Sequence, residues 1–281
     1  MKLDIECNQT SYKVMIQRAV HEIIDKPVVM NDKYTMKLLE CINDGVASLK
    51  EATENDDIMS RILRGSLISR SMYSMNLIKK NRDRVRQIIF LGGGLDTISF
   101  SLSDEHKDLT FFEVDCGEDA LKKKLILDKE NKKPIKIINH DIESNDLFNH
   151  LEMAGVDFSE PVGIIMLGVS IYLQENNFYT LLKKIKKIAA NGSYMAFDYY
   201  IPIDRIPAKY REILTSRFEL LNNLGEPIVF TADTINMVER IKELGFSKIE
   251  NVSADELNST YLLNHSNIKV EGYFNIISFS I

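Results

Sequence analysis

Three successive glycines, Gly92 to Gly94, follow directly after the apolar run Gln87 to Leu91. Glycine allows a tight turn with positive φ and lets a bound molecule lie against the backbone. A short apolar run that ends in such a turn is typical of the first strand and loop of a nucleotide-binding unit. The segment therefore predicts a cofactor site above the end of this strand. The alternative is a plain tight connection between a strand and a helix.

A carboxylate ends the next β-branched run. Asp115 lies 21 residues after Gly94, at the end of the segment Phe112 to Asp115. In a βαβ unit an acidic side chain at this position accepts hydrogen bonds from the two ribose hydroxyls of an adenosine-containing cofactor. Asp115 is therefore the predicted ribose ligand. The competing interpretation is a surface carboxylate that caps a helix beginning near Glu118.

A further carboxylate follows the third run. Asp141 and Ile142 come after Ile135 to Asn139, near the expected position of the adenine ring. Asp141 there would accept the hydrogens of the adenine amino group, and Ile142 would pack on the ring. A role for Asp141 as the N-cap of the following segment competes with this interpretation.

Two cofactor classes share this architecture. A dinucleotide site requires GxGxxG, with a helix N-terminus that faces a pyrophosphate. Here Gly94 is followed by Leu95, Asp96 and Thr97. Asp96 would place a negative charge beside a pyrophosphate, whereas the amino group and sulfonium of S-adenosylmethionine tolerate acidic surroundings. The segment therefore favours S-adenosylmethionine over NAD and makes an NAD-dependent oxidoreductase the less favoured hypothesis.

The surrounding pattern predicts an α/β fold. Apolar residues at helical spacing predict helices over 11–26, 34–51 and 56–80. Behind them, β-branched runs alternate with segments of helical composition, which is typical of a parallel sheet covered by helices on both faces. The last strand is expected to be antiparallel, because too little helix precedes it for a crossover. The predicted strands are Gln87–Leu91, Leu109–Val114, Ile135–Asn139, Val162–Met166, Ser193–Tyr200, Phe246–Val252 and Phe274–Ile281.

The length of 281 residues fits one enlarged α/β domain. We expect a helical N-terminal extension over 1–83 and a Rossmann-like core over 84–200 and 228–281. The prolines and the helical stretch within 201–227 predict a lid inserted into that core.

Composition excludes several classes of protein. A net charge of −6 argues against a nucleic-acid partner, and no segment is apolar enough to span a membrane. The cysteines, Cys7, Cys41 and Cys116, form no CxxC pair, which together with the lack of a secretory signal favours a cytoplasmic protein. The five histidines form no HxH or HxxxH pair, so their spacing predicts no metal site.

Short motifs in order along nearly the whole chain carry a family resemblance. The most specific are Leu91 to Thr97 (LGGGLDT) and Phe112 to Asp115 (FEVD). The chain resembles the S-adenosylmethionine-dependent leucine carboxyl methyltransferase family, including its bacterial O-methyltransferase branch. The other matching pieces are Arg18-Ala19 with Glu22, Arg70 with Leu77 to Lys79, Gly168-Val169 with Tyr172-Leu173, Gly192-Ser193, and Gly225 to Pro227 leading to Phe230.

The resemblance implies a class I methyltransferase: a mostly parallel seven-stranded sheet with one antiparallel strand, a helical N-terminal extension and a cap over the site. It implies transfer of a methyl group from S-adenosylmethionine to a carboxylate or hydroxyl of a small molecule or peptide. The implied cofactor residues are Arg70 for the methionine carboxylate, Gly92 beside the methionine moiety, Asp115 for the ribose, and Asp141 with Ile142 for the adenine.

No catalytic base is evident in the sequence. A carboxylate acceptor is already ionised at neutral pH and needs no base, whereas a hydroxyl acceptor benefits from one. Asp198 and His140, at strand ends, are candidates for that base, although each also suits a structural role. Tyr172, just after the fourth strand, is a candidate for the border of the transferred methyl group.

Two departures from the family pattern support a second hypothesis. Leu167 stands where the family has an acidic residue before its Gly-Val pair, and Cys116-Gly117 stands where proline is usual. A cofactor-binding partner protein with little or no turnover is therefore the alternative to an active enzyme. The identity of the acceptor and the oligomeric state are left open by the sequence.

Overall fold

The computed structural model describes residues 9–127, 135–265 and 267–281. Cys7 lies outside these residues. A seven-stranded sheet with the strand order β3-β2-β1-β4-β5-β7-β6 forms the centre of the molecule. The strands are β1 (Gln87–Leu91), β2 (Thr110–Asp115), β3 (Lys136–Asn139), β4 (Val162–Met166), β5 (Tyr194–Tyr200), β6 (Ser247–Val252) and β7 (Phe274–Ser280).

Six strands of this sheet run in the same direction, and the last strand, β7, runs in the opposite direction. β1 pairs in parallel with both β2 and β4, and β3 and β5 extend the sheet in parallel on either side. β7 lies antiparallel between β5 and β6. The predicted mostly parallel sheet and its antiparallel final strand are therefore confirmed. From β1 the chain builds the sheet toward β3, and it then crosses back to place β4 on the other side of β1.

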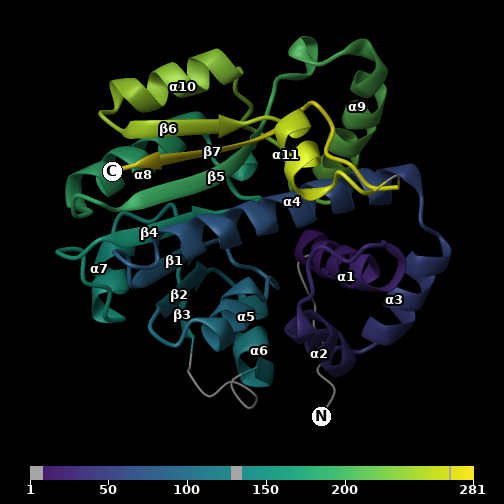
Figure 1. The fold of residues 1–281 in the computed structure, drawn as a ribbon, viewed down its shortest axis with the longest axis horizontal. Coiled ribbons are helices and arrows are strands. Elements are labelled where there is room, and N and C mark those ends of the chain that lie inside the picture. The colour runs from purple at the N-terminus through teal and green to yellow at the C-terminus, as the bar shows by residue number, and fades with distance from the viewer. Residues whose placement is uncertain (1–8, 128–134, 266) are drawn as a thin grey trace.

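Two hydrophobic cores cover the two faces of the sheet, because alternate residues of each strand face opposite sides. In β1, Ile88 packs in one core with residues of the helices α4, α5 and α11. Its neighbour Ile89 packs in the other, with residues of α7, α8 and α10. This arrangement agrees with the layers seen in Figure 1, in which helices lie on both sides of the sheet.

The N-terminal part of the chain is helical, but one predicted helix is divided. The expected single helix over 34–51 consists of two helices, α2 and α3. Ile42 has an extended backbone, and Asp44 adopts a left-handed conformation with φ of 58°. The sequence Asn43 to Gly45 is a turn signal that outweighs the helical spacing of apolar residues around it.

The helices lie around the sheet as Figure 1 shows, with α1, α2 and α3 together at one side and α9 at the same end of the molecule as α11. The predicted lid contains α9 and a short 3-10 helix, Ile203–Arg205. The α-helices are α1 (Gln9–Ile24), α2 (Lys33–Cys41), α3 (Gly45–Glu54), α4 (Ile58–Asn81), α5 (Ile98–Glu105), α6 (Glu118–Leu127), α7 (Leu147–Met153), α8 (Glu175–Ile188), α9 (Ala208–Asn223), α10 (Thr234–Glu243) and α11 (Ala254–Tyr261).

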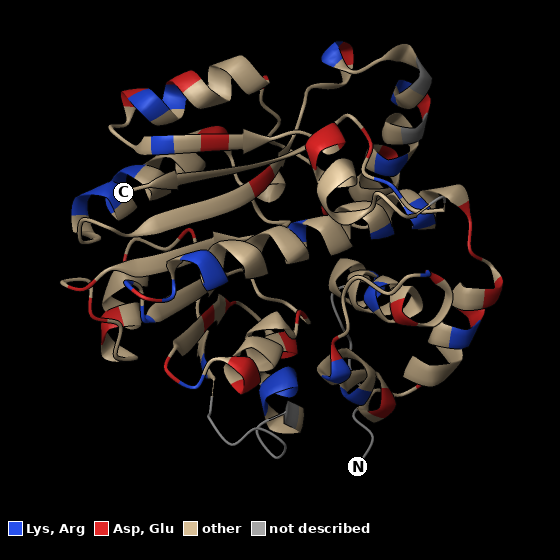
Figure 2. Ribbon diagram, viewed as in Figure 1, with Lys and Arg blue, Asp and Glu red and all other residues tan. Residues whose placement is uncertain are grey.

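Charge is carried mainly by the helices and loops. Figure 2 shows lysine, arginine and acidic residues mixed over the helices, whereas the strands β1, β4 and β7 contain no charged residue. Within the described parts of the chain, no helix is both long and apolar enough to cross a membrane.

Candidate functional site

A cavity of about 520 Å³ opens at the carboxyl ends of β1, β2 and β4. Neighbouring strands β1 and β4 are connected in opposite directions, and open α/β sheets bind their ligands at such a switch point. The volume lies in the range of small-molecule sites. The cavity is lined by the glycine turn after β1, the ends of β2 and β4, the start of α1, and the lid turn, including Ser11, Val14, Arg70, Gly92, Gly94, Asp115, Ile142, Gly168, Tyr172, Glu226 and Val229.

The glycine turn provides bare backbone on the cavity wall. Gly92 and Gly94 both have positive φ, at +74° and +46°. A Cβ at Gly92 would overlap Cγ2 of Val169, and one at Gly94 would come within 2.8 Å of the hydroxyl of Ser11. Glycine is therefore required at both positions by conformation and by the close approach of neighbouring segments.

Asp115 ends β2 directly across from the glycine turn. One of its carboxylate oxygens accepts a hydrogen bond from the backbone N–H of Gly94. Burial raises the pKa of Asp115 above its ordinary value, although the hydrogen bond from Gly94 opposes this effect. The structure thus brings Gly92, Gly94 and Asp115 to one wall of the cavity, where Asp115 could accept hydrogen bonds from a cofactor.

Arg70 reaches the cavity from α4 and lies against the end of β4. A guanidinium nitrogen donates to a carboxylate oxygen of Asp198 at 3.1 Å, and the other oxygen accepts from the backbone N–H of Gly168 at 2.5 Å. A Cβ at Gly168 would lie 2.7 Å from the guanidinium, so this glycine admits Arg70 to the site.

From the sequence, Asp198 is a candidate for a catalytic base that also suits a structural role. Its side chain is 1% exposed and is not among the cavity-lining residues. A carboxylate from β5 thus stands beside the Gly-Val pair, while Leu167, where the family has an acidic residue, lines the cavity. The pairing of Asp198 with a helix more than a hundred residues away gave no local signal in the sequence.

Cationic side chains of α1 and α6 contact Asp96, which follows the three glycines. The guanidinium of Arg18, in α1, pairs with Asp32 at 3.0 Å and with Asp96 of the turn. The ammonium of Lys123 donates to the backbone carbonyl of Asp96 at 2.6 Å and pairs with the buried Glu113 at 2.6 Å. Partial burial alone would raise the pKa of Asp96, but the cationic groups that it faces hold this pKa below the ordinary value. None of these contacts is evident from the sequence.

Tyr172 and the lid turn form the opposite wall. Burial raises the pKa of Tyr172 well above that of an ordinary phenol. Its hydroxyl therefore stays protonated at neutral pH, where it can donate a hydrogen bond but cannot act as a base. Glu226, from the turn that follows α9, lines the same wall. Its role was not predicted, although it belongs to the Gly225 to Pro227 motif.

Of the two residues predicted at the adenine position, one lines the cavity and the other does not. Ile142 lines the cavity. Asp141 is not among the lining residues, and its carboxylate accepts from the backbone N–H of Glu143 at 2.9 Å. This contact agrees with the competing structural interpretation, in which the carboxylate of Asp141 accepts a hydrogen bond from the backbone that follows it. His140, the other candidate base, instead contacts Asp146.

The Gly92→Ala variant is expected to weaken S-adenosylmethionine binding and to lower the free energy of unfolding. The left-handed backbone alone costs a non-glycine residue about 1–2 kcal/mol, and the new methyl group would overlap Val169. Gly245→Ala is the matched control, because Gly245 has φ of +83° and its nearest neighbouring atom would lie 3.6 Å away, outside the cavity. Titration calorimetry should show normal cofactor affinity in Gly245→Ala; equal affinity in both variants would contradict the assignment.

Solved structures resemble most of this chain in fold. A DUF574 family protein of Streptomyces avermitilis is 13% identical with a TM-score of 0.58, over 83% of this chain and 90% of its own. A protein of Thermobifida fusca described as a methyltransferase is 15% identical with a TM-score of 0.60, over 87% and 91%. The S-adenosylmethionine-dependent methyltransferase SibL, in its apo form, is 12% identical with a TM-score of 0.52, over 95% and 69%. A search of curated proteins finds no match.

The strand order, the glycine turn after β1 and the cavity at the switch point define a class I methyltransferase fold. The family model for leucine carboxyl methyltransferase matches residues 11–186, which is more than half of the chain. The chain belongs to this family. Its cofactor is S-adenosylmethionine, and the bare glycine backbone, the carboxylate of Asp115 and the guanidinium of Arg70 around the cavity fit that molecule.

Proposed function

We propose that this methyltransferase is an O-methyltransferase that acts on a carboxylate or hydroxyl of a small molecule or peptide. The observation that supports it is a single cavity that extends from the glycine turn to the lid turn. Cofactor and acceptor can therefore meet in one cavity. The substrate side of this space is formed by Tyr172, Glu226 and Val229, which come from segments outside the βαβ unit.

In this proposal the cofactor lies along the ends of the strands. Asp115 accepts from the ribose hydroxyls, Ile142 packs on the adenine ring, and Gly92 leaves room for the methionine moiety. Arg70 pairs with the methionine carboxylate. The position of Asp141 outside the cavity wall leaves the adenine amino group to other acceptors, so its predicted contact requires the loop after β3 to rearrange.

Methyl transfer from a sulfonium is an in-line displacement, in which the acceptor oxygen forms a bond to the methyl carbon as the carbon–sulfur bond breaks. S-adenosylmethionine supplies the methyl group, and the electron pair of the broken bond remains on sulfur. The protein contributes alignment and exclusion of water. Among the described residues that line the cavity, none is a histidine, and Tyr172 stays protonated. These features favour an ionised carboxylate as the acceptor, since such a group needs no base.

A carboxylate acceptor predicts that the methylated product is a methyl ester. Purified protein incubated with methyl-labelled S-adenosylmethionine and host extract is expected to give label that mild alkali releases as volatile methanol, because alkali hydrolyses esters and leaves ethers intact. The Asp115→Ala variant serves as the control for enzyme-dependent label. Label that resists alkali would contradict the carboxylate and support a hydroxyl acceptor. Absence of labelled product from extracts that contain the natural acceptor would instead favour a protein without turnover.

A variant of Glu226 distinguishes a carboxylate acceptor from a hydroxyl acceptor in a second experiment. Glu226 lines the cavity and comes from the lid turn, on the proposed acceptor side. Glu226→Gln is expected to retain transfer to a carboxylate. A loss of about 100-fold or more in turnover, with cofactor affinity unchanged, would identify Glu226 as the base for a hydroxyl, since general bases contribute about 10²–10⁴-fold.

A further inference from the structure

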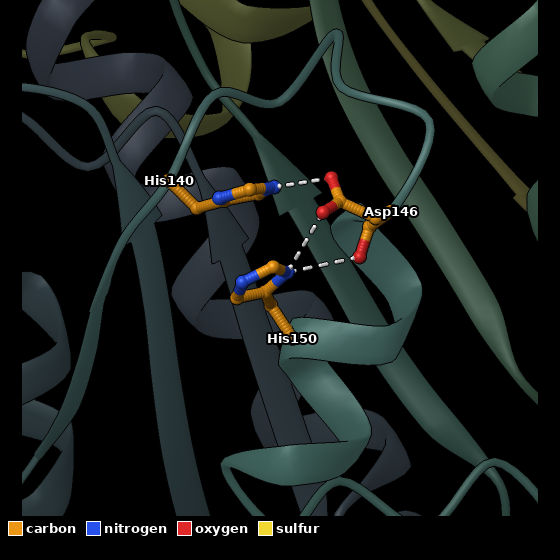
Figure 3. Close-up of side chains that lie close together, drawn as sticks. All are labelled: His140, Asp146 and His150. Carbon is orange, nitrogen blue, oxygen red and sulfur yellow. Dashed lines mark hydrogen bonds and ion pairs between the residues drawn. The ribbon is translucent and has the colours of Figure 1, made fainter.

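A cluster of two histidines and one aspartate lies outside the cavity, where the loop after β3 meets α7. Figure 3 shows the side chains of His140, Asp146 and His150 pointing toward one another. Each residue offers one potential ligand atom, and these atoms all lie within 4.8 Å of one another. His140 comes from the end of the sheet, Asp146 precedes α7, and His150 follows one helical turn later.

The distances between these atoms are close to those between the ligands of one metal ion. Nε2 of His140 lies 2.9 Å from one oxygen of Asp146, and Nδ1 of His150 lies 3.6 Å from the other. In a tetrahedral zinc site with bonds of about 2.0–2.1 Å, neighbouring ligand atoms are about 3.3 Å apart. The two observed distances lie on either side of that value and run to different oxygens of Asp146. Because the two imidazole rings stack at an angle of 20°, the rings must rotate for all three residues to bind one ion.

The chemistry of the ligands selects the class of ion. Imidazole nitrogen suits zinc and other late first-row divalent metals, whereas magnesium and calcium prefer sites made of oxygen atoms alone. The side chains of His140, Asp146 and His150 are 18%, 52% and 39% exposed. The site is thus accessible from solvent, and water can complete a tetrahedral coordination.

We propose that His140, Asp146 and His150 bind a divalent transition metal, with zinc as the ion of choice. The loop between His140 and Asp146 carries Ile142, which lines the cavity. The backbone N–H of His140 also donates to the carbonyl of Asp115 at 3.0 Å. A metal bound here fixes the segment that forms this part of the cavity wall. The metal site itself does not depend on the proposed acceptor.

Without a metal, the same residues form a hydrogen-bonded cluster. The imidazole rings stack with centroids 3.9 Å apart, and Asp146 contacts a nitrogen of each. Nδ1 of His150 also contacts the backbone carbonyl of Asp146 at 3.1 Å. A bound zinc would replace the protons that these nitrogens share with Asp146. The experiment must therefore distinguish coordination from hydrogen bonding.

The test is calorimetric titration of the full chain, freed of metal with a chelator, with zinc alone. We expect one zinc ion per chain and no binding of magnesium under the same conditions. His140→Ala and His150→Ala are each expected to weaken zinc binding by at least about tenfold, because even a residue that only orients a metal ligand contributes about 10–100-fold. Hydrogen exchange of residues 140–150 should slow in the wild type when zinc is added.

Glu152→Ala is the matched control, since Glu152 is exposed on the same helix and is not in the cluster. It should bind zinc as the wild type does. Thermal unfolding without metal shows whether each variant is folded. Unchanged zinc affinity in folded His140→Ala and His150→Ala would overturn the proposal, as would affinity lost in Cys116→Ser and retained in both histidine variants. Binding of zinc without slower exchange over 140–150 would overturn the part that concerns the loop.

Discussion

The Asp115→Ala variant is expected to bind S-adenosylmethionine at least about 100-fold more weakly than the wild type. A carboxylate that accepts from both ribose hydroxyls makes two hydrogen bonds, each worth about 1.5–3 kcal/mol when one partner is charged. Together they correspond to a factor of 100 or more in affinity. The hydrogen bond from the backbone N–H of Gly94 holds the carboxylate of Asp115 at the cavity wall. Calorimetric titration of the variant measures the loss directly.

Asp108→Ala provides the control for this experiment. Asp108 precedes the other end of β2 and pairs with the exposed Arg86. Its loss should leave cofactor affinity unchanged and cost little stability, because exposed ion pairs contribute about 0–1 kcal/mol. The burial that raises the pKa of Asp115 adds a second measurement: wild-type affinity should fall on acidification at a pH above the ordinary aspartate range. Full affinity in Asp115→Ala would overturn the ribose assignment.

The Arg64→Ala variant is expected to lower the free energy of unfolding by about 3–5 kcal/mol, the usual result of removing one partner from a buried ion pair. The side chain of Arg64 is 0% exposed. Its guanidinium binds both oxygens of Asp25, at 2.7 and 3.1 Å, and reaches Gln17 at 2.9 Å and Asp56 at 2.8 Å. Truncation leaves Asp25 buried without its cation. Chemical denaturation monitored by circular dichroism measures the change.

Arg61→Ala is the matched control, because Arg61 lies on the same helix and also binds Asp56, at 2.7 Å, but is 44% exposed. It should cost at most about 1 kcal/mol. A loss of similar size in both variants would contradict the importance of burial for the Arg64 pair.

Asp25 adds a dependence on pH. Burial alone would raise its pKa, but hydrogen bonds from His21 and Arg64 lower it below the ordinary value. A carboxyl group with a lowered pKa in the folded state stabilises the protein above its unfolded pKa, near 3.9, and this stabilisation is lost as the pH falls through the folded value. The wild type should therefore lose stability below about pH 4, and Arg64→Ala should lose less over that interval.

Much of the fold was predictable because its signals are local. The alternation of β-branched runs and helical segments predicted all seven strands, and the short last connection predicted the antiparallel β7. The helix expected over 34–51 was predicted wrongly as one element. There, Asp44 has a left-handed backbone and divides two helices. The turn is only three residues long, so the helical spacing of the apolar residues on both sides of it obscures the turn signal.

The candidate site was predictable in part. The positions of Gly92, Gly94 and Asp115 on one wall of the cavity follow from the rule that parallel strands end at the same edge of a sheet. The resemblance to the family added Arg70, which reaches the same cavity from α4. The roles of these residues in cofactor binding stay predictions that the variants above test.

The sequence by itself determined the class of fold, the family and the edge of the sheet at which the cavity opens, because each depends on residues that are close together in the chain or repeat at a fixed period. Only the tertiary structure decided that Asp198 pairs with Arg70, that Arg18 holds Asp96, and that His140 and His150 share Asp146. Such contacts depend on how helices pack against the sheet and how loops close between them. The spacing of residues along the chain does not show how these elements pack.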